Sequence, residues 1–165
     1  MRAVPIAELH PFVLHFAVGL LLAAPVCDSI GLLLRRETLL FAGRWNTLFG
    51  TLSAALAVLT GLAAESALGP HSPAGDSLLH LHKALGLLAL GVWLPVAGWR
   101  LLSRLALPLR ARTLYLALAY VGAAIVLLQA GLGSVLVYRH GLGLSALARA
   151  EPLPKPAPVQ AEKTR

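Results

Sequence analysis

Two short stretches of this sequence place a histidine four residues before a glycine in a similar apolar setting. LHFAVGLL contains His15 and Gly19, and LHKALGLL contains His82 and Gly86. In a helix, a residue and the fourth residue after it lie on the same face, one turn apart. Each imidazole is therefore expected beside a glycine that leaves room for a flat group.

These residues predict a site for a b-type haem, haem b, in which His15 and His82 are the axial ligands of the iron. Gly19 and Gly86 would line the slot that holds the planar ring. Histidine is a common axial ligand of haem iron, and the surrounding pocket tunes the reduction potential. The chemistry that such a site favours is electron transfer, by a carrier rather than a catalyst.

Five further residues near the same membrane face are candidates for contacts with that group. A proline follows His10, which suits the start of a helix, so His10 is a candidate cap or further ligand. Haem propionates would face the nearby surface, where Arg139, His140 or Lys83 would pair with them. Glu65 would accept a hydrogen bond from an imidazole or from Lys83.

The histidines also admit two other interpretations, which the sequence leaves open. Polar side chains inside a membrane usually face the bundle and find a partner, which here could be a divalent metal or a proton relay. A histidine near a helix end can instead bond only to a backbone carbonyl or to interfacial water. The glycines can simply let membrane helices pack closely.

Composition indicates a membrane protein. The chain has 165 residues, of which 58% are hydrophobic and only 13% charged, whereas soluble domains carry about 25% charged residues. A helix needs roughly 20 apolar residues to cross the hydrocarbon core. Four apolar blocks are long enough, at residues 11–34, 45–64, 78–102 and 113–137. We therefore predict an all-α bundle of four transmembrane helices over residues 1–150, followed by a disordered, proline-rich tail at 151–165.

Several classes of function lack support in the sequence. The net charge is +7, but the arginines lie mostly between apolar blocks, without the basic stripe of a nucleic-acid-binding protein. Cys27 is the only cysteine, so the chain has no disulfide framework and no paired-cysteine metal site. No phosphate-binding loop, serine–base arrangement or pair of carboxylates suggests a kinase or a hydrolase.

The repeated motif further predicts two helical hairpins of the same orientation, related by an axis along the membrane normal. The other two blocks share a weaker match, because Gly50 and Gly61 have the same spacing as Gly122 and Gly133. Such an axis would let the imidazoles of the first and third helices face each other. All six histidines lie toward one membrane face, because successive helices alternate in direction.

The distribution of positive charge predicts which way the helices point. Arginines concentrate near cytoplasmic helix ends in membrane proteins. The first and third connections carry most of them, so we expect these connections in the cytoplasm and both termini outside. Asp28, near the cytoplasmic end of the first helix, is expected to pair with Arg35 or Arg44. Gln129 is expected to hydrogen-bond between helices.

Two stretches together resemble a known family. Residues 9–28, LHPFVLHFAVGLLLAAPVCD, are similar to an opening pattern HPxxVHF, and residues 131–145, GLGSVLVYRHGLGLS, are similar to a closing pattern LVYRHGxG. Both patterns are typical of the bacterial membrane proteins of domain-of-unknown-function family 2231. The chain departs from the family at Ala17, where a proline is usual, and at Val135, where an acidic residue is common. The resemblance implies four membrane helices and no established activity.

The leading hypothesis is a small bis-histidine haem protein of the bacterial inner membrane that transfers electrons near the extracytoplasmic face. Its partners would be the lipid bilayer and a redox protein or a quinone. The alternative is a non-catalytic membrane scaffold or accessory subunit whose histidines are structural or bind a divalent metal. The resemblance also makes Arg139 and His140 candidates for the site.

Overall fold

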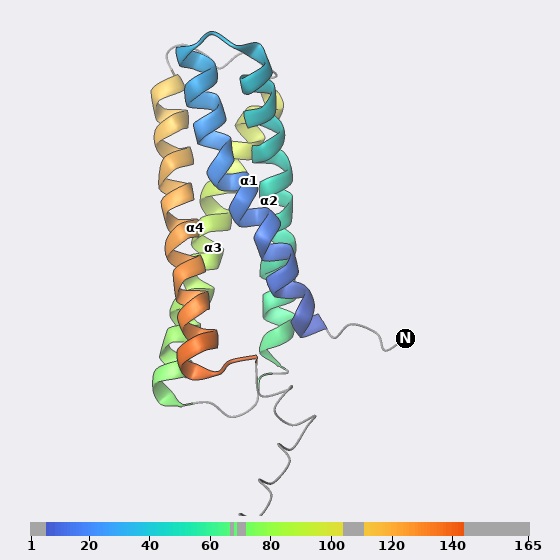
Figure 1. Ribbon diagram of the computed structural model, residues 1–165, viewed down its shortest axis with the longest axis vertical. Helices are drawn as coiled ribbons and strands as arrows, with labels where there is room; N and C mark the ends of the chain where they lie inside the picture. Colours follow the sequence, from blue (N-terminus) through green and yellow to red (C-terminus); the bar gives the residue numbers. More distant parts are fainter. Residues whose placement is uncertain (1–5, 67, 69–71, 104–110, 144–165) are drawn as a thin grey trace, which may run out of the picture.

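The computed structural model consists of four long helices. It describes residues 6–66, 68, 72–103 and 111–143, and the side chains from residue 9 onward. The helices are α1 (Ile6–Leu33), α2 (Glu37–Glu65), α3 (Pro73–Leu102) and α4 (Arg112–His140) (Figure 1). No strand occurs in these described ranges, so the predicted all-α class is confirmed. The predicted tail at 151–165 and His71 lie outside them.

All four helices are long and apolar enough to cross a membrane. They contain 28 to 30 residues each, or about 42–45 Å at 1.5 Å per residue, which exceeds the hydrocarbon thickness of about 30 Å. Their outward faces carry large apolar side chains such as Phe16, Phe49, Leu88 and Leu128, all of them exposed. In lipid these faces are solvated by acyl chains, so the predicted four-helix membrane bundle is confirmed.

Local sequence signals define several helix ends. The Ser72 hydroxyl accepts a hydrogen bond from the Gly75 amide, and Pro73 occupies the first turn of α3. Helix α4 ends at Gly141, whose positive φ of 65° is the left-handed conformation that glycine adopts easily. The capped first turn of α3 extends this helix beyond the apolar block expected to begin at residue 78.

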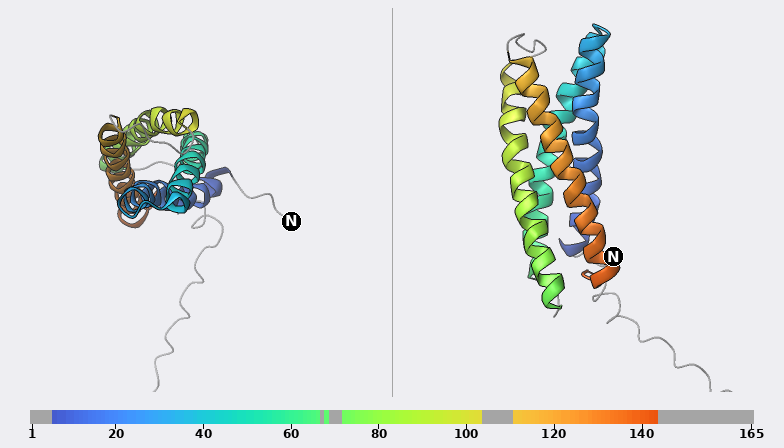
Figure 2. Two further views of the ribbon diagram at one scale, coloured as in Figure 1. Left: turned by 90° about the horizontal axis from the view of Figure 1, so that it is seen from above. Right: turned by 90° about the vertical axis from the view of Figure 1, so that its left-hand side faces the viewer.

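The helices form two antiparallel hairpins that pack together as a square bundle. Seen along the bundle, α1 and α3 stand at opposite corners, as do α2 and α4 (Figure 2). Helix α1 packs against α2 and α4, and α3 packs against the same two helices. The starts of α1 and α3 and the ends of α2 and α4 therefore share one end of the bundle, at the bottom of Figure 1.

The buried faces of the two hairpins repeat with an offset of 72 residues, the separation of Asp28 and Arg100. In α1 and α3 the matched buried residues are Ala17 and Ala89, Leu21 and Trp93, Ala24 and Val96, and Asp28 and Arg100. In α2 and α4 they are Gly43 and Tyr115, Thr47 and Ala119, Gly50 and Gly122, and Thr51 and Ala123. The structure thus contains two hairpin repeats, as expected, but not in the register that aligned His15 with His82.

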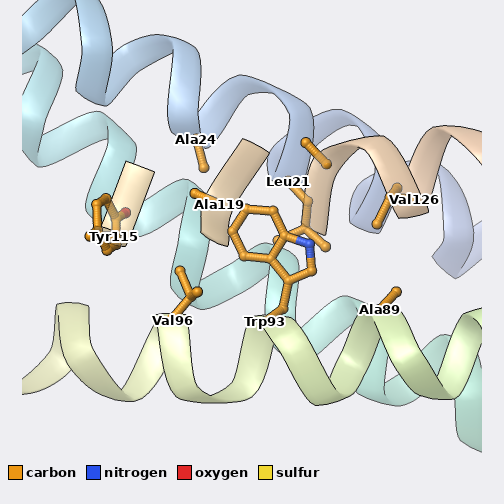
Figure 3. Packing of buried hydrophobic residues seen from close by; sticks show 9 residues of the cluster. Leu21, Ala24, Ala89, Trp93, Val96, Tyr115, Ala119 and Val126 are labelled. Carbon is orange, nitrogen blue, oxygen red and sulfur yellow. The ribbon is translucent and has the colours of Figure 1, made fainter. Parts of the chain in front are cut away.

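The core is built by large side chains from α1 and α3 that fit against glycines of α2 and α4. Trp93 is fully buried at the centre of the bundle (Figure 3). A Cβ atom on Gly122 would lie 2.7 Å from its Nε1, and a Cβ on Gly50 would lie 2.7 Å from Leu21. Glycine is needed at both positions because the equivalent large side chains occupy the space.

Candidate functional site

The histidine end of the bundle brings together two imidazoles, those of His10 and His82. Their ring centroids are 6.4 Å apart, and the ring planes are inclined at 85°. The two residues belong to the diagonal helices α1 and α3 and are separated by the offset that relates the two hairpins. They are therefore equivalent residues that face each other across the bundle.

Each imidazole is fixed by a backbone carbonyl of its own hairpin. Nδ1 of His10 lies 2.7 Å from the Ala57 oxygen, and Nδ1 of His82 lies 3.2 Å from the Gln129 oxygen. A carbonyl can only accept a hydrogen bond, so a neutral ring must carry its proton on Nδ1 and leave a lone pair on Nε2. Neither Nε2 is hydrogen-bonded to another described residue. This tautomer is the one that binds a metal through Nε2.

Two glycines allow the rings to reach those carbonyls. Gly61 and Gly133 lie four residues after the two carbonyl-bearing residues, on the same helix faces. A Cβ on Gly61 would lie 3.0 Å from Cε1 of His10, and one on Gly133 would lie 3.2 Å from Cε1 of His82. The glycines that make room for the imidazoles thus belong to the neighbouring helices.

The structure does not bring His15 to His82, contrary to the expected pairing. His15 is exposed on the outer face of α1, and its Nδ1 contacts the carbonyl of Pro11 in the preceding turn. Five residues separate it from His10, which turns the two side chains about 140° apart on the helix. Gly19 is also exposed, and a Cβ atom added there would meet no other atom within 4 Å, so it does not line a slot.

The other expected contacts lie near the same end but outside the imidazole pair. Gly86 is buried, and a Cβ there would lie 2.6 Å from the side-chain nitrogen of Gln129. The carboxylate of Glu65 accepts two hydrogen bonds from Lys83, at 2.7 and 3.0 Å, and so joins α2 to α3. Arg139 is exposed, whereas His140 is half-buried and lies beside Gly75.

The opposite end of the bundle holds a buried ion pair that the sequence did not reveal. The Asp28 carboxylate lies 2.8 Å from Nη2 of Arg100 and accepts a 2.6 Å hydrogen bond from the hydroxyl of Tyr115. Arg100 also donates to the Leu40 carbonyl at 2.6 Å. Both charged side chains are fully buried, so the expected partners of Asp28 in the first connection were wrong. The missed signal was Arg100 itself, in the last turn of α3.

Comparison with known proteins identifies the family of the chain but no activity. The family described as predicted membrane protein (DUF2231) matches residues 7–146, which include all four helices except the first residue of α1. The chain belongs to this family. No curated protein and no solved structure matches it. The resemblance in the opening and closing patterns is therefore confirmed, and the family description specifies a membrane protein without an activity.

Proposed function

We propose that the protein holds a b-type haem between His10 and His82 and transfers electrons at this end of the bundle. The observation that carries the proposal is the pair of equivalent imidazoles, each with Nδ1 bound to a carbonyl and Nε2 free of described partners. When bound, haem iron supplies one-electron redox chemistry. His10 and His82 would both hold the iron, which favours electron transfer over the binding of a substrate to it.

The spacing of the two imidazoles suits a shared metal, and the number of available ligands supports a haem over a divalent ion. With metal–nitrogen bonds of about 2 Å, two imidazoles that share one metal have centroids roughly 6 Å apart, close to the 6.4 Å between His10 and His82. A structural zinc site needs four ligands, and a catalytic one needs three. The described part of the chain has no group of three or more histidine, cysteine or acidic residues that could hold an ion. A macrocycle supplies the remaining ligands itself.

The charges around the pair also suit such a group. Lys83 follows His82 in α3, and the Glu65 carboxylate holds its ammonium at this end of the bundle. Arg139 and His140 lie in the last turn of α4 at the same end, where we propose that they pair with propionates. His15 keeps no ligand role in this proposal, because it is turned away from the bundle.

A structural role is the second candidate function, and the same hydrogen bonds favour it. Each imidazole joins the start of one helix to the next helix of its hairpin, from α1 to Ala57 in α2 and from α3 to Gln129 in α4. Such links would stabilise a scaffold or accessory subunit without any cofactor. The two functions differ in what the free Nε2 atoms bind.

Visible spectroscopy of the purified full-length protein distinguishes them. The protein would be produced in a haem-replete host, purified in mild detergent, and recorded oxidised and reduced. We expect a Soret band that is lost in His10→Ala and in His82→Ala. It should survive in His15→Ala and His80→Ala, whose side chains are exposed. Size-exclusion chromatography would show which variants remain folded, and a colourless, folded wild-type protein would leave the scaffold function.

We also propose that the protein lies in the bacterial inner membrane with both termini outside the cytoplasm. The connection between α1 and α2 contains Arg35 and Arg36, and the segment 104–110 between α3 and α4 contains two more arginines. The histidine end would then face the extracytoplasmic side, where a redox protein or a quinone would exchange electrons. Reporter fusions at the C-terminus would test this orientation. If a reporter that functions only in the cytoplasm is active there, the protein has the opposite orientation.

A further inference from the structure

The end of the bundle opposite the histidines contains buried hydrogen-bond donors without acceptors. Six buried side-chain atoms lack a partner among the described residues, and five of them lie at this end. The five are Arg44 Nε, Arg100 Nε, Arg100 Nη1, Ser103 Oγ and Arg112 Nε. Buried polar groups in native proteins nearly always have a partner, so a cluster of this kind indicates a bound group or ordered water. Four of the five atoms belong to guanidinium groups, which can only donate.

Four of the five donor atoms, those of Arg100, Ser103 and Arg112, come from the second hairpin, and Arg44 lies in α2 of the first. Ser103 lies three residues after Arg100, on the same side of α3 and about one turn nearer the end of the bundle. The Arg100 guanidinium lies 5.6 Å from the ring centre of Tyr115, and Arg112 lies one turn before Tyr115 in α4. The three donor side chains therefore flank the junction between the end of α3 and the start of α4.

The protein provides few acceptors for them. Both oxygens of Asp28 are already occupied, one by Arg100 and one by Tyr115. Glu37, the other acidic residue in this region, is exposed at the start of α2. The segment 104–110, RLALPLR, has two further arginines and no acid. Because buried donors without acceptors are costly, an external anion, which can only accept hydrogen bonds from them, is the group that would complete this cluster.

We infer that Arg100, Ser103 and Arg112 form a binding site for a phosphate group. A guanidinium binds phosphate oxygens through paired charge-assisted hydrogen bonds, and a serine hydroxyl can donate one more. Helix α3 ends at Leu102 and α4 begins at Arg112, so the cluster lies at the level of lipid headgroups. Basic pockets between membrane helices bind the headgroups of anionic lipids. This site is independent of the proposed haem, at the other end of the bundle.

The phosphate could come from an anionic lipid or from free phosphate, and one titration distinguishes these sources. The thermal unfolding midpoint of the delipidated, full-length protein would be followed with phosphatidylglycerol, with phosphatidylcholine and with inorganic phosphate. A saturable increase with phosphatidylglycerol that exceeds the effect of phosphatidylcholine supports a lipid site. A saturable increase with inorganic phosphate supports a site for the free anion. The absence of a saturable increase in every titration would overturn the inference.

Two variants distinguish binding at this site from nonspecific attraction of anions to the basic end of the bundle. Arg112→Gln and Ser103→Ala should each weaken binding by about tenfold, because each removes a hydrogen bond to a charged group. The unliganded variants should be at least as stable as the parent protein, since their donors have no described partner. Arg35→Gln is the matched control: it removes an exposed arginine at the same end and should leave the affinity within about twofold. Equal losses in Arg35→Gln and Arg112→Gln would contradict a defined site.

Discussion

Asp28 and Arg100 occupy equivalent positions in the two hairpins, and their side chains meet at 2.8 Å across the bundle. His10 and His82 are also equivalent and face each other on the same two helices, at the other end. The first pair is closed by direct contact between opposite charges. The second pair consists of two like rings whose Nε2 atoms have no partner among the described residues. An ion pair thus joins the helices at one end of the bundle, and two facing imidazoles lie at the other.

The buried ion pair predicts that substitution of Asp28 by the isosteric asparagine strongly lowers the free energy of unfolding. Asp28→Asn keeps the shape of the side chain but leaves the Arg100 cation buried without its counter-charge. Removing one partner of a buried ion pair typically costs about 3–5 kcal/mol. We expect a loss of stability of that order, measured by denaturant-induced unfolding in mixed micelles. A loss below about 1 kcal/mol, the range of exposed pairs, would contradict the buried pair.

The double variant Asp28→Leu/Arg100→Leu is the control for that loss. Because apolar side chains often replace a buried ion pair without cost, the double variant should be more stable than either single leucine variant. The coupling measured in this double-mutant cycle assigns the effect to the pair itself. Simple addition of the two single losses would show that the side chains act independently.

Gly61→Ala and Gly133→Ala should disturb the two imidazoles to a similar extent. The added methyl groups would lie 3.0 Å and 3.2 Å from the rings of His10 and His82, so each ring must shift by a few tenths of an ångström relative to its carbonyl. A weakened hydrogen bond should cost up to about 1 kcal/mol in each variant. Any Soret band of the purified protein should weaken or shift in both variants.

Gly19→Ala and Gly131→Ala provide matched controls for these two variants. Gly19 lies in α1, as His10 does, and Gly131 lies in α4, as Gly133 does, and a Cβ atom at either control position would meet nothing within 4 Å. Alanine also favours a helix by up to about 1 kcal/mol over glycine. The controls should therefore be neutral or slightly stabilising, and a loss of stability in them would show that the glycines act through the backbone.

Gly122→Ala should change the environment of Trp93. The new methyl group would lie 2.7 Å from Nε1 of the indole, so the ring must shift within a core where it is fully buried. Overpacking of this kind typically costs about 1–3 kcal/mol. Near-ultraviolet circular dichroism, in a background that replaces Trp45 and Trp99 by phenylalanine, would report the shift. Gly91→Ala, with open space around its Cβ, should leave the spectrum unchanged.

Glu65→Gln should have a small effect on stability, in contrast to Asp28→Asn. The Glu65 and Lys83 side chains are 35% and 32% exposed, although they lie only 2.7 Å apart. Partly exposed ion pairs contribute about 0–1 kcal/mol, because the surroundings screen them. We therefore expect a loss within this range in the same unfolding assay. A loss as large as that of Asp28→Asn would mean that the Glu65–Lys83 pair stabilises the bundle as strongly as a buried ion pair does.

Hydropathy alone was sufficient to predict the four helices and their antiparallel order, because each apolar block is long enough to span a membrane. It could not supply the register of the repeat. Leucine and glycine are so frequent in this chain that LHFAVGLL and LHKALGLL match without being structurally equivalent. This match led to the prediction of His15 as the partner of His82. The glycines at 50, 61, 122 and 133 carried the correct offset. They do so because they make the close contacts with the repeated large side chains.

The partner of Asp28 could not be predicted for a different reason. Arg100 lies near the end of an apolar block, where an arginine usually extends to the membrane surface. Whether this arginine faces the interior depends on how α3 is rotated in the bundle. Because α3 carries apolar side chains on all its faces, its sequence does not show which face is buried. The contact therefore becomes visible only when the helices are packed.

The equivalence of Asp28 and Arg100 has a consequence for how such a bundle can evolve. Two identical, separately encoded hairpins that met about a two-fold axis would place aspartate against aspartate, or arginine against arginine, at this point. Opposite charges at this point require two halves with different sequences, and a single polypeptide supplies such halves in a fixed one-to-one ratio. The two halves therefore differ in charge at one end of the bundle, at Asp28 and Arg100, and supply the same residue type at the other, at His10 and His82.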